Sequence, residues 1–218
     1  MRKIIFIEGT PGVGKTTYIN QLISQKKASF QWVSSDDVIP ENTVRKAIRE
    51  GKSLTIDEAR SIYREKSYFD YCCEHLKIWE NFCINNQAGQ DDIIIDAGLI
   101  QAPLYELIGL YLLSSEQILS HLQKIVDMVK NYFMPELIYI KTPYPDQCIR
   151  KAIENQQERR VQWVKGLCVW LEVAPYPMKK GYSRLQGIEQ FVIDRASVDI
   201  YLIDNLVIDK KIYSRDCV

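Results

Sequence analysis

The segment "IEGTPGVGKTT" at 7–17 restricts what this chain can fold into more than any other feature. Its glycines, lysine and threonines match the spacing GxxxxGK[ST] from Gly9 to Thr16. The apolar run at 4–7 before it predicts a buried parallel strand, and residues 16–26 after it predict a helix with apolar side chains turned inward. A strand, a glycine loop and a helix therefore occur in the order that a phosphate-binding loop requires.

The residue types in this loop suit the binding of phosphate. Backbone N–H groups can turn together toward an anion only where no Cβ interferes, which calls for glycine, and the start of the helix adds a positive dipole end. Lys15 would bring a charge to the β- and γ-phosphates, and the hydroxyl of Thr16 would hold Mg²⁺. The alternative, a glycine-rich turn that binds nothing, is disfavoured because every constrained position of the motif is filled. We predict that ATP and Mg²⁺ are bound by Gly9, Thr10, Pro11, Gly12, Val13, Gly14, Lys15, Thr16 and Thr17.

Length and charge limit the classes of protein to consider. The 218 residues fit a single domain, 1–218, and no repeat or polar linker divides them. The chain has 28 basic and 28 acidic residues, so it has no overall positive field to attract nucleic acid, although a local basic patch is not excluded. A small-molecule acceptor and a nucleotide are the expected partners; the sequence leaves a homodimer open.

The cysteines and the apolar stretches bear on where the protein works. The six cysteines contain no C-x-x-C pair, so we expect neither a disulfide framework nor a zinc site. Cysteines that behave as small apolar residues indicate a reducing compartment, and we expect a cytoplasmic protein. The longest apolar stretch, at 107–113, is too short to span a membrane, so no membrane partner is expected.

The remaining elements alternate between strands and helices. Further strands are predicted at 30–37, 91–98, 136–142 and 205–213, and helices at 40–51, 55–86, 103–113, 115–132, 145–173 and 188–204, with a loop at 174–187. This alternation predicts an α/β fold with a five-stranded parallel sheet and helices on both faces. Ligands in such sheets bind at the carboxyl ends of the strands.

Acidic residues follow two of the predicted strands. Asp96 ends the run at 93–95, and the segment "SSDDVIP" places Asp36 and Asp37 after the second strand. Beside a phosphate loop an acid at a strand end can orient Mg²⁺, so Asp96 is a predicted metal ligand together with Thr16. Transfer to a hydroxyl needs a carboxylate that accepts or aligns its proton, which makes Asp36 and Asp37 catalytic candidates, with Asp36 preferred. The alternative for each of these acids is the capping of a following turn or helix.

Basic and aromatic side chains offer further candidates. Arg150, Arg159 and Arg160 lie in the polar first half of the helical stretch at 145–173, where guanidinium groups could close over the phosphates. Together with the loop at 174–187 they suggest a lid near 145–182; a solvated helix face is the alternative. Tyr71 and His75 share one face of the long predicted helix, and we interpret that face as the polar face of an amphipathic helix rather than an acceptor pocket.

The loop "FIEGTPGVGKTTYINQL", the acidic pair, the strand ending in Asp96 and the arginines of the lid resemble the P-loop kinases of nucleosides, nucleotides and other small molecules. The resemblance spans the chain in the order of its elements, but only the phosphate loop matches specifically. It implies a P-loop NTPase three-layer sandwich of five parallel strands with a mobile lid. It also implies transfer of the γ-phosphoryl group of ATP, with Lys15 as phosphate clamp, Thr16 as magnesium ligand, and Arg159 or Arg160 as lid arginine.

The chain departs from parts of that group. Deoxynucleoside and thymidylate kinases usually carry Asp-Arg after the third strand, whereas this chain has Asp96-Ala97-Gly98. The segment "VSSDDVIP" is more similar to one in kinases of seryl-tRNA and of polynucleotide ends. The expected function is an ATP-dependent phosphotransferase acting on a small molecule, with a tRNA or polynucleotide-end kinase and a nucleotide-dependent regulatory ATPase as the alternatives.

Overall fold

The computed structural model describes residues 1–25, 29–41, 44, 46–47, 50, 52, 54–154 and 158–216, with the side chains of 64, 65 and 158–162 left out. Most of the predicted helix at 40–51 lies outside these residues. Five strands form one parallel sheet in the order β2-β3-β1-β4-β5. The strands are β1 (Lys3–Gly9), β2 (Phe30–Ser34), β3 (Asp92–Asp96), β4 (Met134–Lys141) and β5 (Asp209–Ser214).

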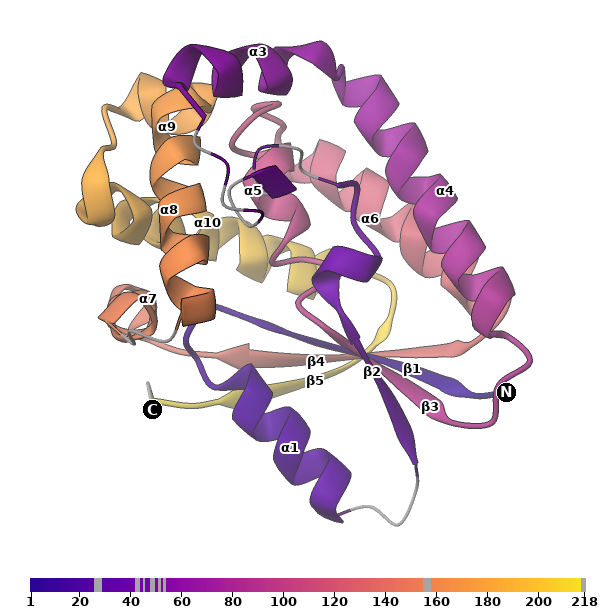
Figure 1. Cartoon of the computed structure of the whole chain (residues 1–218). Helices are drawn as coiled ribbons and strands as arrows, with labels where there is room; N and C mark the ends of the chain where they lie inside the picture. The colour runs from indigo at the N-terminus through magenta and orange to yellow at the C-terminus, as the bar shows by residue number, and fades with distance from the viewer. Residues whose placement is uncertain are drawn as a thin grey trace.

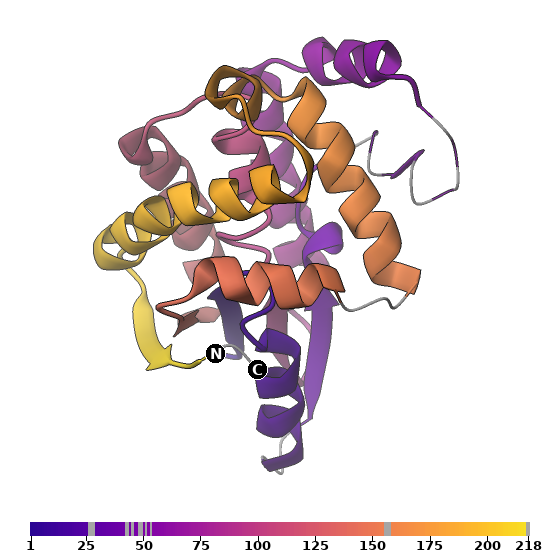
Figure 2. The ribbon, with the colours of Figure 1, turned by 90° about the vertical axis from the view of Figure 1, so that its left-hand side faces the viewer.

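Helices cover both faces of this sheet, which confirms the predicted three-layer α/β fold. One face carries α1 (Lys15–Gln25), and α7 (Pro145–Glu154) lies against the carboxyl ends of the strands (Figure 1). The other face is covered by α3 (Ile56–Glu65), α4 (Tyr68–Asn86), α5 (Pro103–Leu107), α6 (Ser115–Lys130), α8 (Glu158–Val173), α9 (Pro175–Lys180) and α10 (Arg184–Asn205). Figure 2 looks onto the carboxyl ends of the strands, where α7 runs between α1 and α10.

The central strand β1 shows why the sequence forms a doubly covered sheet. Its four apolar residues at 4–7 are at most 1% exposed, because alternate side chains enter two different cores. Ile5 and Ile7 pack with Ile19 of α1, whereas Ile4 and Phe6 pack into the larger core on the opposite face. Since β1 is buried on both faces, the loop that leaves its carboxyl end is held on a rigid support.

A helix prediction and a loop prediction were wrong, and the helix predicted at 103–113 is shorter, because α5 ends at Leu107. The single helix predicted at 55–86 is two helices, because the hydroxyl of Ser67 accepts a hydrogen bond from the backbone N–H of Asp70 and caps a new helix there. The predicted loop at 174–187 contains α9, whose first turn tolerates Pro175, since the first N–H groups of a helix have no partner within it. Gly181 ends α9 in the left-handed conformation, with a φ of 69°.

The structure also bears on the predictions about membrane-spanning segments and cysteines. Among the described residues no helix is long and apolar enough to cross a membrane. Cys72, Cys73, Cys83 and Cys168 are free thiols, as expected. Cys148 takes part in a disulfide bond, which the expectation of a reducing compartment did not include.

Candidate functional site

The predicted phosphate loop connects β1 to α1 and depends on glycine for its path. Gly9, Gly12 and Gly14 have φ angles of 141°, 87° and 92°, a region that residues with a Cβ rarely adopt. A Cβ on Gly9 would lie 2.4 Å from the carbonyl oxygen of Ile140, and one on Gly12 would lie 2.1 Å from that of Cys148. The loop therefore packs directly against β4 and α7, where no larger residue fits.

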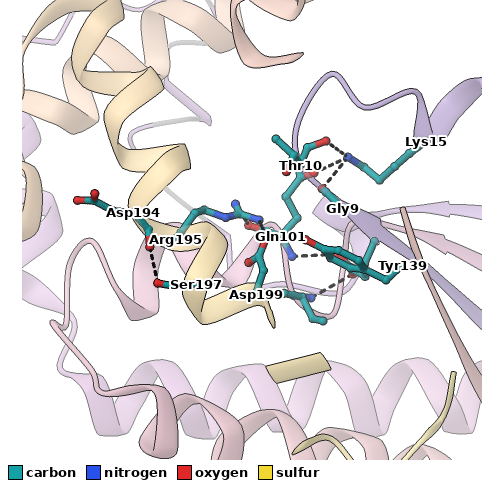
Figure 3. Close-up of polar contacts among 11 residues, drawn as sticks. Gly9, Thr10, Lys15, Gln101, Tyr139, Asp194, Arg195, Ser197 and Asp199 are labelled. Atoms are coloured by element: carbon teal, nitrogen blue, oxygen red, sulfur yellow. Dashed lines mark hydrogen bonds and ion pairs between the residues drawn. The ribbon is translucent and has the colours of Figure 1, made fainter. Parts of the chain in front are cut away.

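Lys15 begins α1 and folds back over this loop. Its ammonium group donates to the carbonyl oxygens of Gly9 and Thr10, at 3.0 and 3.1 Å, and to the side-chain oxygen of Gln101, at 2.5 Å (Figure 3). An ammonium group has three donors, so all three are used. The residue is only 8% exposed. A buried cation thus lies at the mouth of the loop, and within the described part of the chain its hydrogen-bond acceptors are uncharged oxygens.

Burial changes the pKa values of two charged groups in the site, Lys15 and Glu8. Burial lowers the pKa of Lys15 to about 8, although the negative charges of Asp96 and Glu8 oppose that shift. Burial likewise raises the pKa of Glu8 to about 7, against the effect of the backbone N–H groups that bind its carboxylate. Both groups therefore titrate much closer to neutral pH than exposed lysine and glutamate do.

Glu8 connects the phosphate loop to the segment that follows β3. Its carboxylate accepts hydrogen bonds from the backbone N–H groups of Leu99, Ile100 and Gln101, at 2.7, 3.1 and 2.9 Å. This role was missed by sequence reasoning. The available signal was an acid placed inside an apolar strand directly before the first glycine, since a buried carboxylate needs donors nearby.

A second buried charge reaches the same segment from α10. Arg195 is 2% exposed and donates to the carbonyl oxygen of Gln101 at 3.1 Å and to the carboxylate of Asp199 at 3.1 Å. Tyr139 of β4 donates its hydroxyl to the same carboxylate at 3.1 Å (Figure 3). The spacing of Arg195 and Asp199, four residues apart on an apolar helix, was the signal that sequence reasoning passed over.

The two predicted metal ligands lie at the same edge of the sheet. Asp96 ends β3, the strand that neighbours β1, where it is opposite Ile7, and its charge acts on Lys15. Thr16 is exposed in the first turn of α1. A hydroxyl and a carboxylate oxygen are ligands that Mg²⁺ accepts when water and phosphate oxygens complete its shell. These residues fit a magnesium ion that is brought in with a nucleotide.

The two neighbouring acids after β2 differ in their surroundings. Both are exposed and lie in the short 3-10 turn η1 (Ser35–Asp37). The carboxylate of Asp37 accepts a hydrogen bond from the backbone N–H of Ser34 at 3.1 Å and forms part of a capping box. Asp37 thus has the capping role that was its alternative, and Asp36 stays the preferred prediction for the catalytic carboxylate.

The predicted arginines and the residues on the shared helix face lie in different parts of the structure. Arg159 and Arg160 lie in α8, but their side chains fall outside what the structure describes. Arg150 of α7 makes two hydrogen bonds of 2.9 Å to the carboxylate of Glu189 on α10, so its guanidinium group has a structural partner. His75 is fully buried and lies 3.0 Å from His121 of α6, and Tyr71 is 3% exposed, so the interpretation of these residues as part of a polar helix face was wrong.

Comparisons with known proteins give likenesses in structure only. No family model matches the chain, and no curated protein matches it in sequence. A structure from the PezAT chromosomal toxin-antitoxin system of Streptococcus pneumoniae is similar to this chain at 13% identity with a TM-score of 0.47; the alignment covers 100% of this chain and 71% of the other. A shikimate kinase from Bacteroides thetaiotaomicron is 12% identical with a TM-score of 0.44, over 98% of this chain and 86% of the other. A gluconokinase from Sinorhizobium meliloti 1021 is 10% identical with a TM-score of 0.38, over 100% of this chain and 85% of the other. At such values activity has to be argued from the site alone.

Proposed function

We propose that this chain is an ATP-dependent phosphotransferase that moves the γ-phosphoryl group to a hydroxyl or phosphate group of a small molecule. The observation that carries the proposal is the state of Lys15. Its three donors meet amide oxygens, those of Gly9, Thr10 and Gln101. A buried charge is costly unless an opposite charge compensates it. Asp96 and Glu8 supply part of that compensation through their charges. A phosphate group in the glycine loop would add a negative charge in direct contact.

Each residue of the site has a distinct task in such a transfer. The N–H groups of the loop and Lys15 would hold the β- and γ-phosphates and stabilise the charge that develops on the transferred group. Thr16 and Asp96 would hold Mg²⁺, which neutralises charge on the phosphate oxygens when it is bound. Asp36 would align the acceptor hydroxyl and receive its proton late in the transfer.

The proposal is tested by release of ADP from Mg²⁺ and ATP in the presence of candidate acceptors. The panel consists of nucleosides, nucleotides, sugars, amino-alcohol metabolites and tRNA. We expect release that depends on one class of small molecule. Release with tRNA alone would instead identify a nucleic-acid kinase, and release that no acceptor changes would identify a regulatory ATPase.

The variant Lys15→Ala ties this activity to the loop. Loss of the ammonium group should lower turnover by about 10²-fold or more, because one preorganised contact to the developing charge is removed. Lys77→Ala is the matched control, since Lys77 is exposed on α4 far along the chain from the loop. Unchanged turnover of a folded Lys15→Ala protein would refute the assignment of the loop.

A further inference from the structure

Among the described partners of Lys15, Gln101 is the one that can leave it without moving the main chain. The other two acceptors, the carbonyl oxygens of Gly9 and Thr10, belong to the backbone of the phosphate loop. The acceptor of Gln101 is a side-chain amide, which changes position by rotation about single bonds. Because all three donors of the ammonium group are occupied, an arriving phosphate has to replace at least one of these oxygens.

The backbone of Gln101 is held from two sides while its side chain contacts Lys15. Its N–H donates to the carboxylate of Glu8 at 2.9 Å, and its carbonyl oxygen accepts from Arg195 at 3.1 Å. Glu8 is 0% exposed and Arg195 is 2% exposed. Buried charges of this kind are retained only with good hydrogen-bond partners, and here the backbone of Gln101 is a partner of both. The side chain therefore starts from a fixed point beside the loop (Figure 3).

The chemical nature of the side chain matters as well as its position. An amide oxygen satisfies the lysine donor but carries no net charge, so it competes weakly with a phosphate for the ammonium group. A carboxylate at this position would form an ion pair with Lys15 and would also repel the phosphates. The neutral amide of Gln101 orients the ammonium group of Lys15 and leaves its charge available to bind a phosphate group.

We propose that Gln101 is a positioning residue that holds Lys15 in place over the empty loop and yields it to the phosphate group of the bound nucleotide, while Glu8 and Arg195 fix its backbone. This inference rests on the proposed function, because it takes a nucleotide phosphate as the ligand of Lys15. It adds a residue to the site that neither the loop motif nor the acids at the strand ends identify.

Two variants of opposite character test the exchange by calorimetric titration with ADP and Mg²⁺. Gln101→Glu should weaken binding by about tenfold or more, because an ion pair must be broken and like charges are brought together. Gln101→Met has a similar length without an acceptor, and it should bind no more weakly than the wild type. Gln87→Glu is the control for added charge, since Gln87 is exposed at the end of α4. Equal affinity of Gln101→Glu and the wild type, or loss of binding in Gln101→Met, would overturn the proposal.

A second measurement needs no nucleotide and separates the two proposals. The pKa of Lys15 is obtained from the pH dependence of its acylation rate, read by mass spectrometry of the labelled peptide. Gln101→Glu should raise this pKa, and Gln101→Met should lower it, because a hydrogen-bond acceptor favours the charged amine. An unchanged pKa in both variants would refute the contact between the two side chains. If the pKa shifts as expected but the wild type binds no nucleotide, the proposed function fails while the contact stands.

Discussion

Asp36 and Asp37 follow one another in the chain, and the structure gives Asp37 a defined capping role. Asp37 accepts the backbone N–H of Ser34 and closes the capping box of η1. Both carboxylates are exposed near the end of β2. Adjacent acids of equal charge therefore separate into a cap and a candidate catalytic group.

This difference gives a prediction for two matched variants. Asp36→Asn should lower turnover by roughly 10²- to 10⁴-fold and leave ATP binding nearly unchanged, because a positioned acid or base acts on the transfer step. Asp37→Asn should change turnover little, and Asp37→Ala should cost about 1 kcal/mol of stability, because it removes the acceptor that caps η1. Steady-state kinetics with the true acceptor and urea unfolding decide between them. An inactive Asp37→Asn beside an active Asp36→Asn would reverse the assignment.

The residues that sequence reasoning did not find share one property. Glu8, Gln101 and Arg195 act through contacts between segments that are about 90 positions apart in the chain. The loop motif predicts Lys15 because its chemistry is encoded in neighbouring residues. No local pattern shows that the backbone of Gln101 will meet a carboxylate from β1 and a guanidinium group from α10.

At the scale of elements, α4 and α6 are joined by two buried histidines. The indole N–H of Trp79 donates to Nε2 of His75 at 3.1 Å, so His75 carries its proton on Nδ1. Nδ1 of His75 lies 3.0 Å from Nε2 of His121, and with the proton on Nδ1 the His121 nitrogen accepts this hydrogen bond. Burial lowers the pKa of His75 to about 3 and that of His121 to about 4, so both rings are neutral in the folded protein.

These shifts predict a loss of stability in acid. The unfolded chain binds a proton at each histidine below pH 6.5, whereas the folded chain stays neutral until pH 3 to 4. The stabilisation is therefore complete above pH 6.5 and falls with decreasing pH, by up to about 1.4 kcal/mol per pH unit for each ring. Glu8 acts in the opposite sense between pH 4.5 and 7, because its folded pKa is raised.

A comparison of two proteins at each pH isolates the histidines from Glu8. His121→Leu should cost about 1–3 kcal/mol at pH 7, because the N–H of His75 loses its acceptor, and it should unfold with a shallower pH dependence. Urea unfolding at intervals between pH 5 and 7.5 measures both quantities. Parallel stability curves for His121→Leu and the wild type would contradict this account of the pair.

The helices and strands also show which structural features a sequence pattern can predict. Each of the five strands lies within or close to its predicted range, and the three central strands β1, β3 and β4 were evident because a strand buried on both faces is a continuous apolar run. The predicted edge strands at 30–37 and 205–213 were too long, since β2 ends at Ser34 and β5 begins at Asp209. The break between α3 and α4 was missed because the apolar spacing continues across it; only the cap at Ser67 marks it. The helix α9 was missed because proline and glycine were taken as signs of a loop, although they lie at its start and just past its end.

At the scale of the whole molecule, the predicted lid at 145–182 is not uniform. The second half of α8 belongs to the main core, where Leu167, Trp170 and Leu171 are at most 6% exposed and the ring centre of Trp170 lies 4.7 Å from that of Phe191. Residues packed in this way do not swing as a lid. By the same measure α7 is packed, since Cys148 and Ile149 are 0% exposed. Closure over a nucleotide is therefore a prediction for the first half of α8, which lies at the carboxyl ends of the strands (Figure 2).

The most direct measurement of the central claim is hydrogen exchange with and without ATP and Mg²⁺, resolved by mass spectrometry, on the wild type and on Lys15→Ala. The account predicts slower exchange at 8–17 in the wild type, with further protection in the first half of α8, because closure excludes water from the phosphates. Both effects should be absent in Lys15→Ala. Slower exchange at 8–17 alone would contradict the proposed lid and support the proposed phosphate site. Unchanged exchange at 8–17 in the wild type at saturating ATP would contradict the claim that this loop binds a nucleotide.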